Sequence, residues 1–276
     1  MSGREPSEIP VRLGNLPPLN AIANQVLAAT AKPHVDFKQL AAMMECDPAF
    51  AADALLVANS ALFGFRSRIQ QLRHALSVLG TDRIKGLAIT VAMRSFMGNS
   101  GPLVRQCWQH SIACAIVARA ISPNFGITGD TAYTLGLMHD VGRLGLLKSY
   151  PAEYSQVLGE TFEDVDHVLR AERGLFRADH GVAGWWLVNQ WSFPSTFAQV
   201  CEHHHAELSD DDPELLQVVK VACRMAEAIG FAGVCYSHEP DYGEALQRLP
   251  RRLSPEAFPS ASELKATVEA QLRSFG

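Results

Sequence analysis

The sequence predicts an all-α fold in which an N-terminal helical layer packs on a helical bundle. Apolar residues recur at helical spacing through most of the 276-residue chain, whereas the alternation typical of strands hardly appears. Capping residues such as Asp36 and Asp47 stand directly before several of these apolar runs. Hydrophobic residues make up 47% of the chain, which is enough for a sizeable core. These observations favour one large helical domain or two closely packed subdomains.

The N-terminal layer is predicted over about residues 12–97. Asp36 caps a helix that extends to Cys46, and Asp47 caps the next helix, whose first turn contains Pro48. The core contacts of this second helix are expected from Leu55, Leu56 and Leu62.

Glycines mark the end of the N-terminal layer. Gly80 is predicted to stop a helix, and Thr81–Asp82 opens a new helical run that reaches about Phe96. The segment Gly98–Pro102 is the clearest internal break. It is too short for a flexible tether, so we expect the bundle to begin directly after it.

The bundle is predicted over about residues 102–230, and a loop-rich C-terminal extension over 231–276. In the extension, Ser260–Glu263 is a capping box that predicts a terminal helix. Apolar periodicity predicts the helices of the bundle at about 102–121, 128–148, 151–159, 161–173, 179–191, 194–205 and 212–230.

Charge and cysteine content limit the classes of function. The net charge of -5 gives no overall attraction for nucleic acid, and the basic clusters Arg66–Arg68 and Arg83–Lys85 lack the interleaved aromatic residues of single-strand binders. No stretch approaches the roughly 20 apolar residues of a membrane-spanning helix, and the N-terminus lacks the apolar core of a signal peptide. The six cysteines form no C-x-x-C pair, which indicates reduced thiols. We therefore expect a cytoplasmic protein that binds neither membrane nor nucleic acid.

His139 and Asp140 form the most informative motif, because they place two types of metal ligand side by side. His110, His180 and the segment His203–His205 fall on other predicted helices with apolar faces, which is how helical metal sites are assembled. Histidine and carboxylate together can hold Fe, Mn, Zn or Mg. On a regular helix adjacent side chains diverge by about 100°, so both reach one centre only if other helices surround it. Asp140 is the best bridging candidate, since a carboxylate has two oxygens.

A second, local metal site is conceivable on one helix. Cys107, His110 and Cys114 stand three and four residues apart on one face. Buried free cysteines are more often small apolar packing residues, so packing is the simpler interpretation.

Short motifs occur in a fixed order along both halves of the chain. The N-terminal half contains Leu16–Leu19, Asp47–Pro48, Ala58–Ala61 and Ala75–Gly80. The bundle contains Trp108–Ser111, His139–Arg143, Asp179–His180, Trp191–Pro194 and His204–His205. In this combination the chain resembles the HDOD domains, a divergent regulatory branch of the HD metallohydrolase superfamily, over roughly residues 12–230.

The resemblance implies an HD-like bundle with a metal centre. By the family spacing, His204 and His205 point inward and His203 is exposed. Arg143 either grips a substrate phosphate with its guanidinium or is a surface helix arginine paired with a nearby acid. Gly142 is expected to permit close helix packing beside the site. The implied metal ligands are His110, His139, Asp140, His180, His204 and His205.

Three departures from the catalytic pattern bear on activity. Cys223 stands where catalytic HD enzymes have an Asp within an Ala-Asp pair, and Gln106 stands where HD-GYP cyclic-di-GMP phosphodiesterases often place an acidic ligand. The segment after His205 contains no Gly-Tyr-Pro. A Cys223 thiolate could still bind Zn or Fe, whereas a neutral packed thiol, the simpler interpretation, leaves the site one anionic ligand short. We therefore expect a single or substoichiometric metal.

The resemblance favours a signal-transduction module with a degenerate metal site. Such a module is expected to act through a regulatory protein partner, or through a nucleotide or phosphate ligand. The alternative is a metal-dependent phosphohydrolase acting on a nucleotide or other phosphate ester, with Asp140 and Arg143 as its catalytic residues. Metal-dependent turnover that Asp140→Asn abolishes would decide between them.

Overall fold

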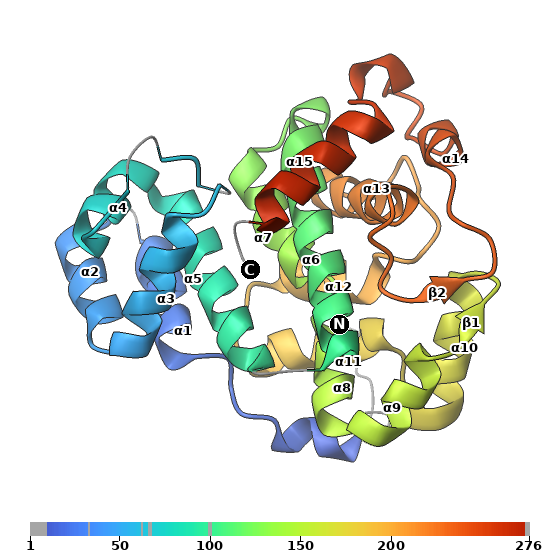
Figure 1. Ribbon diagram of the computed structural model, residues 1–276, viewed down its shortest axis with the longest axis horizontal. Coiled ribbons are helices and arrows are strands. Elements are labelled where there is room, and N and C mark those ends of the chain that lie inside the picture. Colours follow the sequence, from blue (N-terminus) through green and yellow to red (C-terminus); the bar gives the residue numbers. More distant parts are fainter. Residues whose placement is uncertain (1–9, 33, 62, 66–67, 99–100, 274–276) are drawn as a thin grey trace. The chain divides into compact units, whose positions relative to one another are not determined.

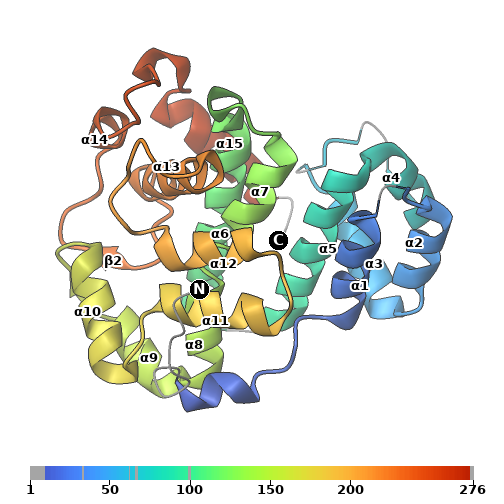
Figure 2. The same ribbon diagram turned by 180° about the vertical axis from the view of Figure 1, so that it is seen from behind.

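The computed structural model describes most of the chain (Figures 1 and 2). Within the described residues the protein is helical apart from two strands of two residues each, which confirms the all-α prediction. No helix among them is long and apolar enough to span a membrane. Two predictions fall outside the described residues: the core contact of Leu62 and the cluster at Arg66–Ser67. The described residues are 10–32, 34–61, 63–65, 68–98 and 101–273.

The chain divides into two units, one of residues 1–17 and 100–265 and the other of residues 18–99 and 266–276. The division falls within α15 (Ala261–Arg273). The helices of the second unit are α1 (Ala21–Thr30), α2 (Phe37–Glu45), α3 (Pro48–Ala58), α4 (Leu72–Leu79) and α5 (Thr81–Met97).

Side-chain caps start α2 and α3 as predicted. Asp36 Oδ1 accepts hydrogen bonds from the backbone N–H groups of Lys38 and Gln39, at 2.8 and 3.1 Å. Asp47 Oδ1 accepts from Ala49 and Phe50, at 3.0 and 3.1 Å. Each cap satisfies donors that the first turn of a helix leaves unpaired.

The buried face of α3 differs from the predicted one. Phe50, Ala54 and Val57 are buried, whereas Leu56 is 51% exposed and Leu55 is only partly buried. The cap at Asp47 fixes where the helix starts, and the i, i+4, i+7 positions from Phe50 then form the core face. Leu55 and Leu56 lie off that face.

Gly80 ends α4 and precedes α5, as predicted. Its φ of 75° lies in the region that only glycine adopts without strain. The following helix begins at Thr81 and continues to Met97, close to the predicted end.

The first unit contains the bundle and most of the C-terminal extension. In both views of the molecule α6, α7 and α13 lie side by side (Figures 1 and 2). Short 3-10 turns cover Val11–Asn15, Ser122–Phe125 and Pro255–Ala257. Its α-helices are α6 (Pro102–Ile121), α7 (Gly129–Met138), α8 (Val141–Ser149), α9 (Pro151–Leu158), α10 (Val165–Phe176), α11 (His180–Gln190), α12 (Ser195–His203), α13 (Glu214–Ala228) and α14 (Tyr242–Gln247).

The predicted continuous helix over 128–148 is wrong, because the chain breaks at His139–Asp140. α7 ends at Met138 and α8 begins at Val141, and Asp140 has φ -108° and ψ 20°, outside the helical region. The break redirects the chain so that α8 packs closely on α11. The side chains of His139 and Asp140 are therefore not separated by the regular helical angle of about 100°.

The predicted helix start at residue 161 is also wrong. Thr161–Phe162 forms strand β1, which pairs in parallel with β2 (Cys235–Tyr236). α10 begins later, where Asp164 accepts a hydrogen bond from the N–H of His167 at 2.8 Å. Two residues are too few for the alternation that reveals a strand in a sequence.

The capping box of the C-terminal extension is confirmed. Glu263 donates its N–H to Ser260 Oγ at 3.3 Å, and the carboxylate of Glu263 accepts from the N–H of Ser260 at 2.8 Å.

Candidate metal centre

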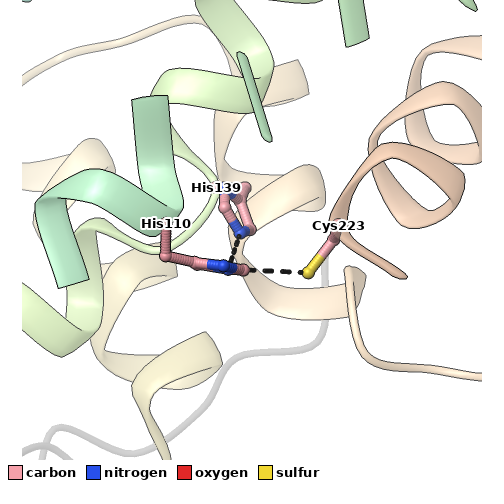
Figure 3. Close-up of side chains that lie close together, drawn as sticks. All are labelled: His110, His139 and Cys223. Atoms are coloured by element: carbon pink, nitrogen blue, oxygen red, sulfur yellow. Dashed lines mark hydrogen bonds between the residues drawn. The ribbon is translucent and has the colours of Figure 1, made fainter. Parts of the chain in front are cut away.

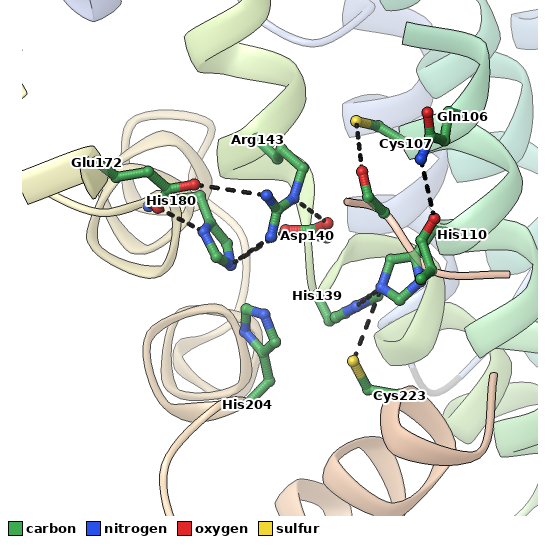
Figure 4. Close-up of polar contacts among 12 residues, drawn as sticks. Gln106, Cys107, His110, His139, Asp140, Arg143, Glu172, His180, His204 and Cys223 are labelled. Carbon is green, nitrogen blue, oxygen red and sulfur yellow. Dashed lines mark hydrogen bonds and ion pairs between the residues drawn. The ribbon is translucent and has the colours of Figure 1, made fainter. Parts of the chain in front are cut away.

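All six predicted metal ligands come together inside the first unit. The centroid of the His204 ring lies 4.8 Å from the ring centroid of His139, 5.4 Å from that of His180 and 4.0 Å from that of His205. The carboxylate Oδ1 of Asp140 is 3.4 Å from His180 Nε2. Figure 4 shows how five of the six predicted ligands, His110, His139, Asp140, His180 and His204, face one another from α6, the α7–α8 break, the start of α11 and the end of α12.

Four of the histidines have their Nδ1 atom fixed by an acceptor. Nδ1 of His110 lies 2.7 Å from Phe231 O, that of His139 lies 2.6 Å from Gly136 O, and that of His204 lies 2.8 Å from Cys201 O. Nδ1 of His180 lies 2.7 Å from the carboxylate of Glu172. Carbonyl and carboxylate oxygens only accept, so each Nδ1 carries the proton and each Nε2 is left as an acceptor, which in His180 already receives a hydrogen bond from Arg143. This is the arrangement that prepares histidine to bind a metal.

The first compact group of donors is His110, His139 and Cys223 (Figure 3). His110 Nε2 lies 3.2 Å from His139 Nε2 and 3.7 Å from Cys223 Sγ. Two bare lone pairs at this separation repel unless a cation lies between them. Burial, followed by the neighbouring charges of His204 and His110, holds the pKa of His139 well below its usual value. The group therefore fits a metal ion in chemistry and in geometry.

The second compact group is His180, His204 and His205. Nε2 of His204 and Nε2 of His205 are buried without a hydrogen-bond partner, as is Oδ1 of Asp140. Burial and the charge of His180 lower the pKa of His204 to about 3, so this ring is neutral. Burial, together with the neighbouring rings of His204 and His180, likewise places the pKa of His205 well below its usual value. Neutral rings with unpaired acceptors also suit a cation.

Arg143 already supplies one cation to this centre. Its Nε donates to Asp140 Oδ2 at 2.8 Å, its second guanidinium nitrogen donates to His180 Nε2 at 3.2 Å, and its third lies 3.5 Å from Glu172. The residue is only 3% exposed, so the interpretation as a surface arginine is wrong, although it does pair with an acid. Burial alone would raise the pKa of Asp140, but Arg143 and the neighbouring histidines together outweigh it and hold that pKa well below the usual value.

Sequence reasoning missed two residues that support His180. Glu172 accepts from both the N–H and the Nδ1–H of His180, and Tyr154 donates to Glu172 at 2.5 Å. Burial raises the pKa of Glu172, but His180 and Arg143 outweigh this effect and lower it to about 2. Glu172 stands in an ordinary polar stretch of α10, where its sequence carries no signal of this role. Only the meeting of α10 with α11 reveals it.

Gln106 and the other α6 thiols do not join the donor groups. Gln106 donates to the carbonyl of Ala232 at 3.3 Å, and Cys107 Sγ lies 4.0 Å from the carbonyl of Gly233. Burial raises the pKa of Cys107 to about 12, although the charge of Arg143 opposes this effect. His110 groups with His139 and Cys223 rather than with Cys107 and Cys114, so the local site on one helix is not formed.

Gly142 permits the close packing predicted for it. A Cβ added at this glycine would lie 1.9 Å from the carbonyl oxygen of His180 and 2.4 Å from the nitrogen of Gly184. α8 and α11 thus touch backbone to backbone beside the donor groups. This contact holds the α7–α8 break against the start of the helix that carries His180.

Known proteins share this arrangement of helices. Residues 16–207 match the sequence model of the HDOD domain family. The chain belongs to the HDOD domain family. Membership confirms the resemblance drawn from the motifs, and with it the HD-like fold. Two residues of the site lie beyond the matched region: Cys223, which completes the first donor group, and Phe231, whose carbonyl fixes His110.

Two solved structures with the HD-like fold have names that point in different directions. A protein of Shewanella amazonensis SB2B named "Putative metal-dependent phosphohydrolase" is 23% identical, with a TM-score of 0.68 and 96% of each chain covered. A protein of Marinobacter aquaeolei VT8 named "Putative signal transduction protein" is 18% identical, with a TM-score of 0.66, and the match covers 94% of this chain and 60% of that chain. At these identities the likeness shows the fold alone.

A curated relative is considerably longer than this chain. An uncharacterized protein of Treponema pallidum (strain Nichols) is 23% identical over 202 residues, which are 70% of this chain and 38% of that protein. The chain therefore spans less than half the length of this relative.

Proposed function

We propose that this HDOD protein is a regulatory module of signal transduction with a degenerate metal centre. It acts by binding a regulatory protein partner or a ligand rather than by turning over a phosphate ester. The observation that carries the proposal is the engagement of Arg143 with Asp140 and His180. The relative named for signal transduction, which has the same fold, supports this direction.

Arg143 bears on catalysis because phosphoryl hydrolysis in two-metal sites needs both ions. A second ion would have to bind through Asp140 and His180, where Asp140 Oδ2 and His180 Nε2 already accept hydrogen bonds from the guanidinium and Asp140 Oδ1 alone has no partner. A cation that is covalently part of the chain neutralises Asp140 but generates no hydroxide. The buried position of Arg143 also leaves its guanidinium nitrogens committed to protein groups instead of a substrate phosphate.

The remaining donors suit a single ion of the softer kind. His110, His139 and Cys223 offer two imidazole nitrogens and a sulfur, a set that favours Zn or Fe over Mg. When bound, such an ion would link α6, the α7–α8 break and α13. Occupancy of the metal site would then affect the arrangement of these helices and the surface that meets a partner.

A phosphohydrolase remains the second candidate, because one observation favours it. His180 and His204 have their Nδ1 atoms fixed and their Nε2 atoms aimed at the centre near Asp140, as a hydrolase would require. The relative named for metal-dependent phosphohydrolysis also has this fold. In this reading Arg143 would have to leave Asp140 and bind the substrate.

The two candidates are separated by turnover. The purified chain is incubated with cyclic-di-GMP and with a generic phosphate ester while Mn, Fe, Zn or Mg is titrated. We expect no metal-dependent rate above background, and no difference between the wild type and Asp140→Asn, because Asp140 is committed to Arg143. Robust turnover that requires metal and disappears in Asp140→Asn would overturn the regulatory proposal and establish the hydrolase.

A further inference from the structure

A cavity of about 680 Å³ in the first unit leads to the donor groups. Its inner wall includes His204, His205 and Cys223, and Glu227 lies one helical turn beyond Cys223 on α13. Its outer walls are the start of α10, the end of α12, and the segment from β2 into α14. The proposed function leaves the ligand of this cavity open.

The cavity is strongly anionic. Ten of its lining residues are Asp or Glu and three are Arg. One of the three, Arg173, is already paired with Asp179 at 2.6 Å. The potential inside such a cleft attracts cations and repels phosphate groups, which disfavours the nucleotide or phosphate ligand expected from the sequence.

The helix ends that border the cavity add further negative charge to it. The last turn of α12 and the residues after it, His203–Glu207, line the wall, and a helix C-terminus carries partial negative charge. The N-termini of α10 and α11 also reach the cavity, but they are capped. Asp164 accepts from His167 N at 2.8 Å, and Asp179 accepts from Val182 N at 2.9 Å. These caps place further carboxylates where an anion would otherwise bind.

An unpartnered acceptor lies at the inner end of the cavity. His204 is 2% exposed, its Nε2 has no hydrogen-bond partner, and its proton is fixed on Nδ1 by Cys201 O. Nε2 can therefore only accept, and it suits an N–H donor. Glu227, which also lines the cavity, accepts a hydrogen bond from the hydroxyl of Tyr236 at 3.2 Å.

We propose that the cavity binds an extended organic cation that carries several ammonium groups. One ammonium group donates to His204 Nε2, and the others lie among the carboxylates of the outer walls. The ligand is extended rather than a single small cation because the acids come from separate segments, including Glu163, Glu202, Glu239 and Glu244. This inference rests on the proposed ligand-binding role and names the class of ligand.

The source of the ammonium groups is either a free polyamine or a lysine-rich segment of a partner protein. Calorimetry with spermidine and with a tetralysine peptide distinguishes them, and inorganic phosphate is the anionic comparison. We expect binding of at least one cation and no binding of phosphate. Tighter binding of spermidine assigns the site to free polyamines, and tighter binding of tetralysine assigns it to a peptide.

Charge removal at the rim tests the location. The triple variant Glu163→Gln, Glu239→Gln, Glu244→Gln changes only exposed side chains, so the fold should persist. It should weaken cation binding about tenfold, since each exposed ion pair contributes modestly. The control Glu269→Gln removes a carboxylate of α15 that does not line the cavity, and it should bind as the wild type does.

Two results would overturn the cation site. One is that neither cation binds more tightly than phosphate, and the other is that the triple variant and Glu269→Gln bind the cation equally well. Metal content and phosphate-ester turnover are measured on the same samples. If they remain as proposed while cation binding is absent, the inference about the cavity fails alone and the regulatory proposal stands.

Discussion

Gly142→Ala is expected to destabilise the protein by about 3 kcal/mol or more, near the top of the range for overpacking. The new Cβ would lie 1.9 Å from the carbonyl of His180 and 2.4 Å from the nitrogen of Gly184, both backbone atoms that cannot rotate away. α8 and α11 would have to separate, which also displaces His180 from Asp140. Denaturant unfolding of the variant and the wild type measures the loss.

The matched control is Gly174→Ala on α10. No atom lies within 4 Å of a Cβ built there, so alanine fits, and it favours the helix by up to about 1 kcal/mol over glycine. If Gly142→Ala were as stable as Gly174→Ala, the backbone contact between α8 and α11 would not exist in solution.

Arg143→Met should have the second large effect, a loss of about 3–5 kcal/mol in the free energy of unfolding. The substitution keeps the volume of the side chain but leaves the buried carboxylates of Asp140 and Glu172 without their cation. Chemical denaturation at neutral pH measures this loss. The cost arises from uncompensated charge rather than from a cavity, so Arg143→Lys should recover part of it.

Arg173→Met provides the comparison for Arg143. Arg173 also pairs with an acid, Asp179, but its side chain is 56% exposed, and a pair of this kind contributes about 1 kcal/mol or less. Equal stability of Arg143→Met and Arg173→Met would show that Arg143 does not neutralise the metal centre.

Much of the helical framework follows from local signals. Asp36 and Asp47 cap the helices predicted after them, and α6 has the predicted bounds of 102–121, since capping and apolar period act over a few residues. The break at His139–Asp140 could not be predicted in this way. It is imposed by the contact of α8 with α11, which joins residues about forty positions apart in the chain.

The same distinction applies to the candidate site. The six ligand positions were predicted by resemblance to a family, and the structure brings them together. The groups that hold these ligands in place were not predicted. Glu172 reaches His180, and the carbonyl of Phe231 reaches His110, only through tertiary packing. The position of Arg143 was left open for this reason as well, because a charged residue in a helix gives no local sign that it faces inward.

The central claim is that His110, His139 and Cys223 hold one ion while Arg143 occupies the Asp140 side of the centre. Reconstitution with Co²⁺, followed by elemental analysis and absorption spectroscopy, tests it most directly. We predict one tightly bound Co²⁺ per chain with a thiolate-to-cobalt charge-transfer band, which is lost in Cys223→Ser and kept in the control Cys114→Ser. Two tightly bound ions per chain without a thiolate band would contradict the account.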